Sequence, residues 1–229
     1  MNLPRTGLDI IAENQPLPGE FTHDDREMVY FLAEISVRTL LNRIHHAFYS
    51  NHEVSKQVMI SLNVELRRQL ESWLQSIPST ERPVVEGNGV FTEQNSNIRQ
   101  KILQIRYFAA RQILYRPFIL LTLASNQQPE YRILENCRQC IDTAKAYLNC
   151  ITAVMSLPGP YIWTFCQSSF GTILTLIAAW RHPYLEPYLG DMKELLSMVI
   201  NNLNKWKHLN PTIKAHVWIL QTIQQKCFY

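Results

Sequence analysis

The segment from Tyr161 to Arg181 is almost free of charged residues, and it constrains the possible folds more than any other part of the sequence. A helix of this composition is hydrophobic on nearly all sides, so it belongs inside a bundle of other helices. Its longest apolar window, Gly171 to Trp180, is too short to span a bilayer. We therefore expect the central helix of a soluble bundle, and no membrane partner.

The remaining sequence repeats apolar residues at steps of three and four, the pattern of amphipathic helices. Asp191 and Asn210 are placed to cap helix starts, as are Thr22 and Asp24 for the first helix, while Pro129 suits a first turn. No segment predicts a strand. The repeats predict helices over about 24–48, 53–76, 98–123, 129–157, 161–181, 191–206 and from 211 onward.

Pro117 lies inside the third predicted helix. It lacks an amide proton and its ring clashes with the carbonyl of Ile113, so we expect a kink or a break beside it. The predicted fold is all-α, a single irregular bundle of about six to seven helices kinked at Pro117. At 229 residues the chain is long enough for one domain with a substantial core.

The domain organisation follows from where the helical repeats begin. Residues 1–22 contain three prolines and few periodic apolar positions, which predicts an extended N-terminal arm. Residues 23–229 form the predicted helical domain. Within it, the segment 76–97 holds two prolines and two glycines with little periodicity, so we expect one long loop there.

Charge and cysteine content exclude several classes of protein. The net charge is +3 and the longest basic run is the pair Arg67-Arg68, so direct nucleic-acid binding is not expected. The N-terminus lacks a secretory pattern, which favours an intracellular protein, cytoplasmic or nuclear. Five cysteines form an odd set that we expect to be reduced. The pair Cys137 and Cys140 lies within a helix without two further ligands at suitable spacing, so neither zinc nor another cofactor is expected.

No common catalytic motif is present, but two polar clusters are candidates for a site. His45 and Tyr49 share a helix face at i, i+4 and could transfer a proton in a pocket, with Arg111 as a third catalytic candidate. The alternative, which we favour, is one paired core histidine and one solvated histidine. Tyr107, Arg111 and Tyr115 follow at steps of four and could hold an anionic or enolic ligand, or could simply brace the helix.

The third candidate cluster lies on the charge-free segment. Polar atoms there would orient a ligand if the helix lined an apolar pocket, since such pockets combine apolar walls with few polar groups. The alternative is that these groups only bond to nearby backbone carbonyls. The predicted ligand-binding residues of this segment are Trp163, Cys166, Gln167 and Phe170.

Four stretches, taken together and in order, resemble the fungal-specific transcription factor homology domain that follows binuclear zinc-cluster DNA-binding domains. They are Tyr30–Ser50, Ile105–Leu121, Cys137–Ile151 and Pro160–Tyr184, and the resemblance covers roughly residues 25–225. The cysteine-rich zinc cluster and the first half of that domain have no counterpart here. The resemblance implies a regulatory domain that responds to ligands, with apolar helix faces that a homodimer, a partner protein or an apolar small molecule would cover.

Two functions remain open from the sequence. The first is a regulatory or ligand-binding module of fungal, and specifically secondary, metabolism that acts through a small molecule or a protein. The second is a cofactor-free enzyme, a cyclase or isomerase of an apolar metabolite, that reuses the helical pocket. A closed cavity where the polar candidates converge would favour the enzyme. A filled core with an exposed apolar surface would favour the regulatory module.

Overall fold

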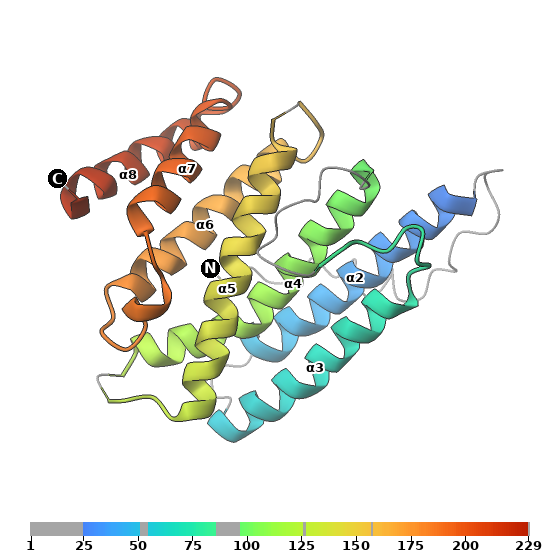
Figure 1. Cartoon of the computed structure of the whole chain (residues 1–229), viewed down its shortest axis with the longest axis horizontal. Helices are drawn as coiled ribbons and strands as arrows, with labels where there is room; N and C mark the ends of the chain where they lie inside the picture. The colour runs from blue at the N-terminus through green and yellow to red at the C-terminus, as the bar shows by residue number, and fades with distance from the viewer. Residues whose placement is uncertain (1–24, 51–54, 86–96, 126, 157, 229) are drawn as a thin grey trace.

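The computed structural model of the chain describes residues 25–50, 55–85, 97–125, 127–156 and 158–228. Within these ranges the chain forms seven α-helices and one 3-10 turn, without a strand (Figure 1). The predicted all-α bundle is confirmed. The elements are α2 (Asp25–Tyr49), α3 (Lys56–Ser76), α4 (Ile98–Leu123), α5 (Tyr131–Val154), α6 (Ile162–Trp180), η1 (Glu186–Tyr188), α7 (Met192–Asn204) and α8 (Pro211–Phe228).

Two of the predicted helix caps are confirmed by side-chain hydrogen bonds. The Asp191 carboxylate accepts from the Glu194 amide at 2.9 Å at the start of α7. At the start of α8, the Asn210 side chain accepts from the Thr212 amide at 2.8 Å. These bonds satisfy amides that have no partner within the first turn of a helix.

One other predicted helix start is wrong, and the predicted caps of the first helix lie outside the described residues. Pro129 precedes the N-cap residue Glu130 and so lies outside α5 rather than in its first turn, because the helix begins only at Tyr131. The predicted arm over 1–22 and the caps Thr22 and Asp24 lie outside the described residues. The division into an arm and a helical domain therefore stays a prediction.

The charge-free helix α6 packs inside the bundle against α4, α5, α7 and α8, but the expectation that it is buried on nearly all sides is wrong. α4 contacts α2, α3, α5 and α6. One side of α6 faces outward, where the side chain of Trp163 is 55% exposed. By its length and composition α6 could cross a membrane, but half of its most apolar window is buried in the fold, as in a core helix.

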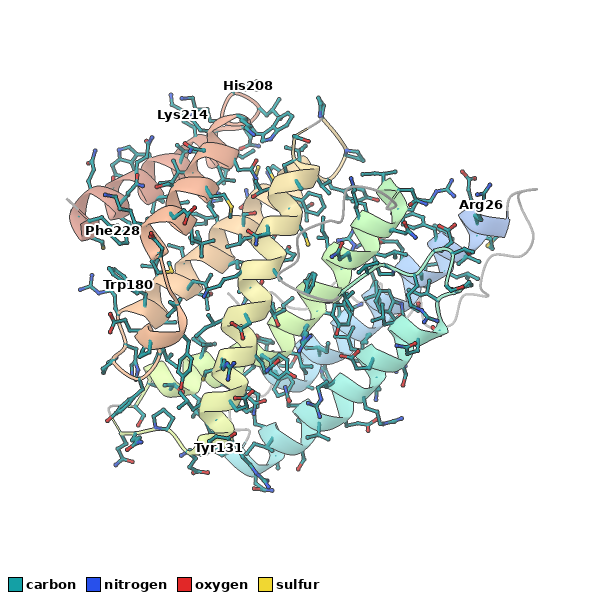
Figure 2. All side chains as sticks on the ribbon, in the orientation of Figure 1. Arg26, Tyr131, Trp180, His208, Lys214 and Phe228 are labelled. Carbon is teal, nitrogen blue, oxygen red and sulfur yellow. The ribbon has the colours of Figure 1, made fainter. Side chains whose placement is uncertain are left out.

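Helices α6 and α8 run side by side in the same direction, as two aromatic stacks along them show. The rings of Phe170 and His216 lie 3.8 Å apart and almost parallel. Further along, Trp180 stacks on Phe228 with 4.9 Å between ring centroids (Figure 2). In Figure 1, α7 and α8 occupy the side of the molecule opposite to α2 and α3.

Polar side chains join the helices inside the core. Arg106 of α4 donates from Nε to both carboxylate oxygens of Glu34 on α2, at 3.1 and 3.2 Å, and both residues are at most 8% exposed. The side chains of Gln112 and Thr172 bond to each other between α4 and α6, with 2.9 Å from Nε2 to the hydroxyl. These bonds pair the Glu34 carboxylate and the side chains of Gln112 and Thr172, as burial of polar atoms requires. The Nη2 atom of Arg106 is buried without a partner among the described residues.

Pro117 is the most consequential residue of α4. The helix continues through it to Leu123, and its ribbon changes direction in this C-terminal part (Figure 1). Because residue 117 has no amide proton, the carbonyl of Ile113 lacks the donor that lies four residues on in a regular helix. The Tyr49 hydroxyl from α2 supplies a donor instead, at 3.0 Å.

The two neighbouring carbonyls also receive side-chain donors from other helices. The Asn63 amide of α3 donates to the carbonyl of Leu114 at 3.4 Å, and the Cys140 thiol of α5 donates to the carbonyl of Gln112 at 3.7 Å. Asn63 and Cys140 are 3% and 1% exposed, so neither has water as an alternative partner. Three helices thus meet the kinked helix at three consecutive carbonyls, Gln112, Ile113 and Leu114, which we name the Pro117 carbonyl cluster.

This arrangement predicts that Tyr49 and Pro117 are energetically coupled. We expect Tyr49→Phe to lower the free energy of unfolding by about 1–2 kcal/mol, because a buried carbonyl loses its donor. Pro117→Ala supplies an amide to the same carbonyl, so the double variant should lose about 1 kcal/mol less than the two single variants together. Urea denaturation followed by circular dichroism measures all four free energies of the cycle.

Tyr131→Phe is the matched control, since the Tyr131 side chain is 80% exposed, and it should leave the free energy of unfolding unchanged. Simple additivity of Tyr49→Phe and Pro117→Ala would show that the hydroxyl does not replace the missing amide.

Candidate functional site

The predicted proton-transfer pair lies at the C-terminal end of α2. His45 is exposed, and its ring stacks on that of Tyr49 with 5.1 Å between centroids. Burial raises the pKa of Tyr49 above its usual range. Its hydroxyl proton is already donated to the carbonyl of Ile113. The pair is therefore a ring stack at the surface joined to a structural hydrogen bond, and its catalytic role stays a prediction.

The residues Tyr107, Arg111 and Tyr115 share one face of α4, as their spacing predicts. The guanidinium carbon of Arg111 lies 6.0 Å from the ring centres of both tyrosines, which are almost fully buried. Arg111 donates from Nη2 to Gln139 of α5 at 2.8 Å and from Nη1 to the Tyr107 hydroxyl at 3.4 Å. Tyr107 in turn donates to Glu71 of α3 at 2.8 Å. These contacts brace three helices together.

The four candidate ligand-binding residues on α6 lie in different environments. Trp163 faces outward and Cys166 is fully buried. Phe170 stacks on His216 of α8, a contact that the sequence analysis missed because α8 follows some 40 residues later. Gln167 is half-buried, and its Nε2 atom has no hydrogen-bond partner among the described residues. A helix-face pattern alone could not have identified these partners.

The candidates therefore do not converge on one cavity. Tyr107, Arg111 and Tyr115 lie together toward α5, Tyr49 is bonded to the Pro117 carbonyl cluster, and the α6 residues divide between α8, the core and the surface. Neither of the two cavities described below has a lining that combines His45 or Tyr49 with Arg111 or Gln167.

An open groove of about 860 Å³ runs between α2 and α3. We name it the α2–α3 groove, and the sequence analysis did not identify it. Small polar residues of both helices recur in its lining, namely Ser36, Thr39, Ser72 and Ser76. The described residues that line it are Val29, Leu32, Ala33, Ile35, Ser36, Thr39, Leu40, Arg43, Arg68, Gln69, Ser72, Trp73, Ser76, Ile77 and Pro78.

Hydroxyl groups in the groove have partners within their own helices. Ser36 donates to the carbonyl of Leu32 at 2.8 Å, and Ser76 donates to the carbonyl of Trp73 at 2.7 Å. The Trp73 indole donates to the carbonyl of Ala33 at 3.1 Å. Because these donors are satisfied, the groove presents mainly a carbon surface to an occupant.

The charged residues that line the groove are two arginines, and they differ in their partners. None of the described lining residues is acidic. Arg68 is bound to Glu65, at 3.0 Å from Nε and 2.8 Å from Nη2, and this bond lowers the pKa of Glu65 to about 2. Arg43 makes no hydrogen bond or ion pair with any described residue. One end of an apolar groove therefore carries an uncompensated cation.

The cysteines do not form a metal site in the part of the chain that the structure describes, where no group of three or more histidine, cysteine or acidic residues could hold an ion. All five are free thiols. Burial raises the pKa of Cys137 and Cys166 to about 11 and that of Cys140 and Cys150 to about 12. Cys227 is partly exposed beside Arg181.

Thiol labelling tests this description directly. At pH 8 we expect a single fast equivalent of Ellman's reagent to react with the native chain, because the thiolate is the reactive form and four thiols keep their protons up to a much higher pH. Absorbance at 412 nm gives the count, and all five thiols should react in 6 M guanidinium chloride. Cys227→Ser should remove the fast equivalent. Fast reaction of two or more native thiols would contradict the buried positions.

Sequence comparison places the chain beside a fungal protein. No known family profile matches the chain, and no solved structure matches it. It is 26% identical over 156 residues to an Aspergillus rugulosus protein named "Putative transcription factor ecdB". The match covers 67% of this chain and 28% of the relative, so the chain spans less than a third of that protein's length. The resemblance to a fungal transcription factor is supported to this extent, while the particular homology domain is not.

Proposed function

We propose that the chain is a regulatory binding module of the transcription-factor type, and that its binding surface is the α2–α3 groove. The observation that carries the proposal is an open, apolar groove on a bundle whose interior is filled by packed side chains. Exposed apolar surface rimmed by polar residues is a common form of protein–protein interaction site. The sequence similarity to a fungal transcription factor supports a regulatory use of that binding.

The shape of the groove favours a helix as its occupant. Small-molecule pockets bury most of the ligand surface, whereas an open groove leaves one side of its occupant in water, as when an amphipathic helix lies along it. On α2 the lining runs from Val29 to Arg43, 14 residue steps or about 21 Å. That length matches a helix of about four turns. Arg43 at one end would pair with an acidic residue of the partner.

The enzyme reading has no comparable support. It required the polar candidates to meet in a closed cavity, whereas His45 is exposed and the Tyr49 hydroxyl is bonded to a backbone carbonyl. A cyclase or isomerase activity stays a prediction. The predicted homodimer, the apolar metabolite as an alternative occupant and the setting in secondary metabolism stay predictions.

A reporter assay tests the proposal in a fungal host. With the chain fused to an unrelated DNA-binding domain, we expect it to change transcription of a reporter that carries the matching sites. Ile35→Glu places a carboxylate in the groove, where an apolar occupant would desolvate it, and should reduce the change by about tenfold or more. Reporter output relative to the DNA-binding domain alone is the measurement.

Val64→Glu is the matched control, because Val64 is 53% exposed on α3 and is not part of the groove lining. It should leave reporter output unchanged, and thermal unfolding should show both variants folded. No effect of the unmodified chain, or equal effects of the two variants, would overturn the proposal.

A further inference from the structure

A second cavity lies between α4 and α5 and belongs to neither the α2–α3 groove nor the Pro117 carbonyl cluster. Its volume is about 580 Å³, within the range of small-molecule sites. Unlike the groove, it is lined largely by polar side chains. We name it the α4–α5 pocket, and the residues that matter here are Arg111, Gln139, Asp142, Thr143 and Lys145.

Two cationic side chains, Arg111 and Lys145, line this pocket. Each has N–H donors that form no hydrogen bond with a described residue. Arg111 has five N–H donors, of which one is given to Gln139 and one to the Tyr107 hydroxyl. Its Nε atom has no partner. Lys145 donates to the carbonyl of Tyr188 at 2.8 Å, which leaves two of its three protons. Burial lowers the pKa of Lys145, and the nearby carboxylate of Asp142 offsets part of this shift.

The one carboxylate of the lining is turned outward. Asp142 is 57% exposed and lies 3.8 Å from Nε of Arg138, which is not part of the pocket. The Thr143 side chain is almost fully buried, and no hydrogen bond to its hydroxyl is found among the described residues. The pocket therefore combines two cations with a free hydroxyl, and its one carboxylate, although largely exposed, still acts on Lys145.

The positions of Arg111 and Lys145 indicate how long a ligand must be to contact both. Arg111 is fixed opposite Gln139 of α5, and Lys145 begins six residues further along the same helix. Six residues correspond to about 9 Å along a helix axis. The guanidinium of Arg111 is bonded to Gln139 and the ammonium of Lys145 to Tyr188 of η1, so an extended molecule with an anionic group at each end suits the two cations better than a compact anion.

We propose that the α4–α5 pocket binds a small extended dicarboxylate, with one carboxylate on Arg111, the other near Lys145, and the Thr143 hydroxyl as an additional donor. The planar guanidinium, held between two tyrosine rings, presents its remaining donors in the fork that matches a carboxylate. This site is separate from the proposed groove and takes a polar ligand rather than an apolar partner.

Calorimetric titration of the whole chain with adipate, a six-carbon dicarboxylate, tests this proposal. We expect saturable binding, and binding at least about tenfold weaker for hexanoate, which has the same length and a single carboxylate. Inorganic phosphate should also bind at least about tenfold more weakly, because it is too compact to span the two cations. Absence of saturable adipate binding at concentrations up to about 10 mM, or equal affinity for adipate and phosphate, would overturn the proposal.

Two variants identify the site. Lys145→Gln and Arg111→Lys should each weaken adipate binding about tenfold or more, the second because an ammonium cannot make the forked contact. Lys214→Gln on α8 is the matched control and should bind adipate as the unmodified chain does, since Lys214 lies at the far side of the molecule (Figure 2). Circular dichroism should confirm that each variant is folded. Unchanged affinity in Lys145→Gln would exclude the pocket as the binding site.

Discussion

The carbonyl group freed by Pro117, together with its two neighbours, is the constraint on which the arrangement of the N-terminal half depends. A proline inside a buried helix leaves a carbonyl that water cannot reach, and an unpaired buried carbonyl is costly. Here α2, α3 and α5 each direct one polar side chain, Tyr49, Asn63 and Cys140, at three consecutive carbonyls. The apolar core would tolerate sliding of these helices, whereas directional hydrogen bonds to a bent backbone fix their relative positions.

The same constraint explains why local spacing was a poor guide to the chemistry of Tyr49. Its i, i+4 relation to His45 suggested proton transfer, but the acceptor of its hydroxyl is 64 residues away in sequence. A helix-face pattern describes only neighbours on one helix. The partner of a buried hydroxyl is chosen by packing, which depends on the whole fold.

The secondary structure was largely predictable, because each helix has an apolar repeat and several have a capping side chain such as Asp191 or Asn210. The packing of the helices against one another was not predictable from the sequence. Composition favoured α6 as the most buried helix, whereas α4, with its arginines, is buried more deeply. Arginine can be buried when a carboxylate or a ring lies beside it, as Glu34 and Tyr161 do for Arg106, and such partners come from distant segments. The α2–α3 groove escaped prediction for a related reason, since it is a space between helices rather than a motif on one.

Polar contacts also connect the two proposed binding surfaces. Arg111, which lines the α4–α5 pocket, bonds to Tyr107, and Tyr107 bonds to Glu71 of α3. Gln69, Ser72 and Trp73, within two residues of Glu71 on either side, line the α2–α3 groove. The position of this turn of α3 is therefore determined both by the guanidinium in the pocket and by the packing of the groove. An anion bound at Arg111 would therefore compete with the Tyr107 hydroxyl for the guanidinium, two hydrogen bonds away from the turn of α3 that contributes to the groove.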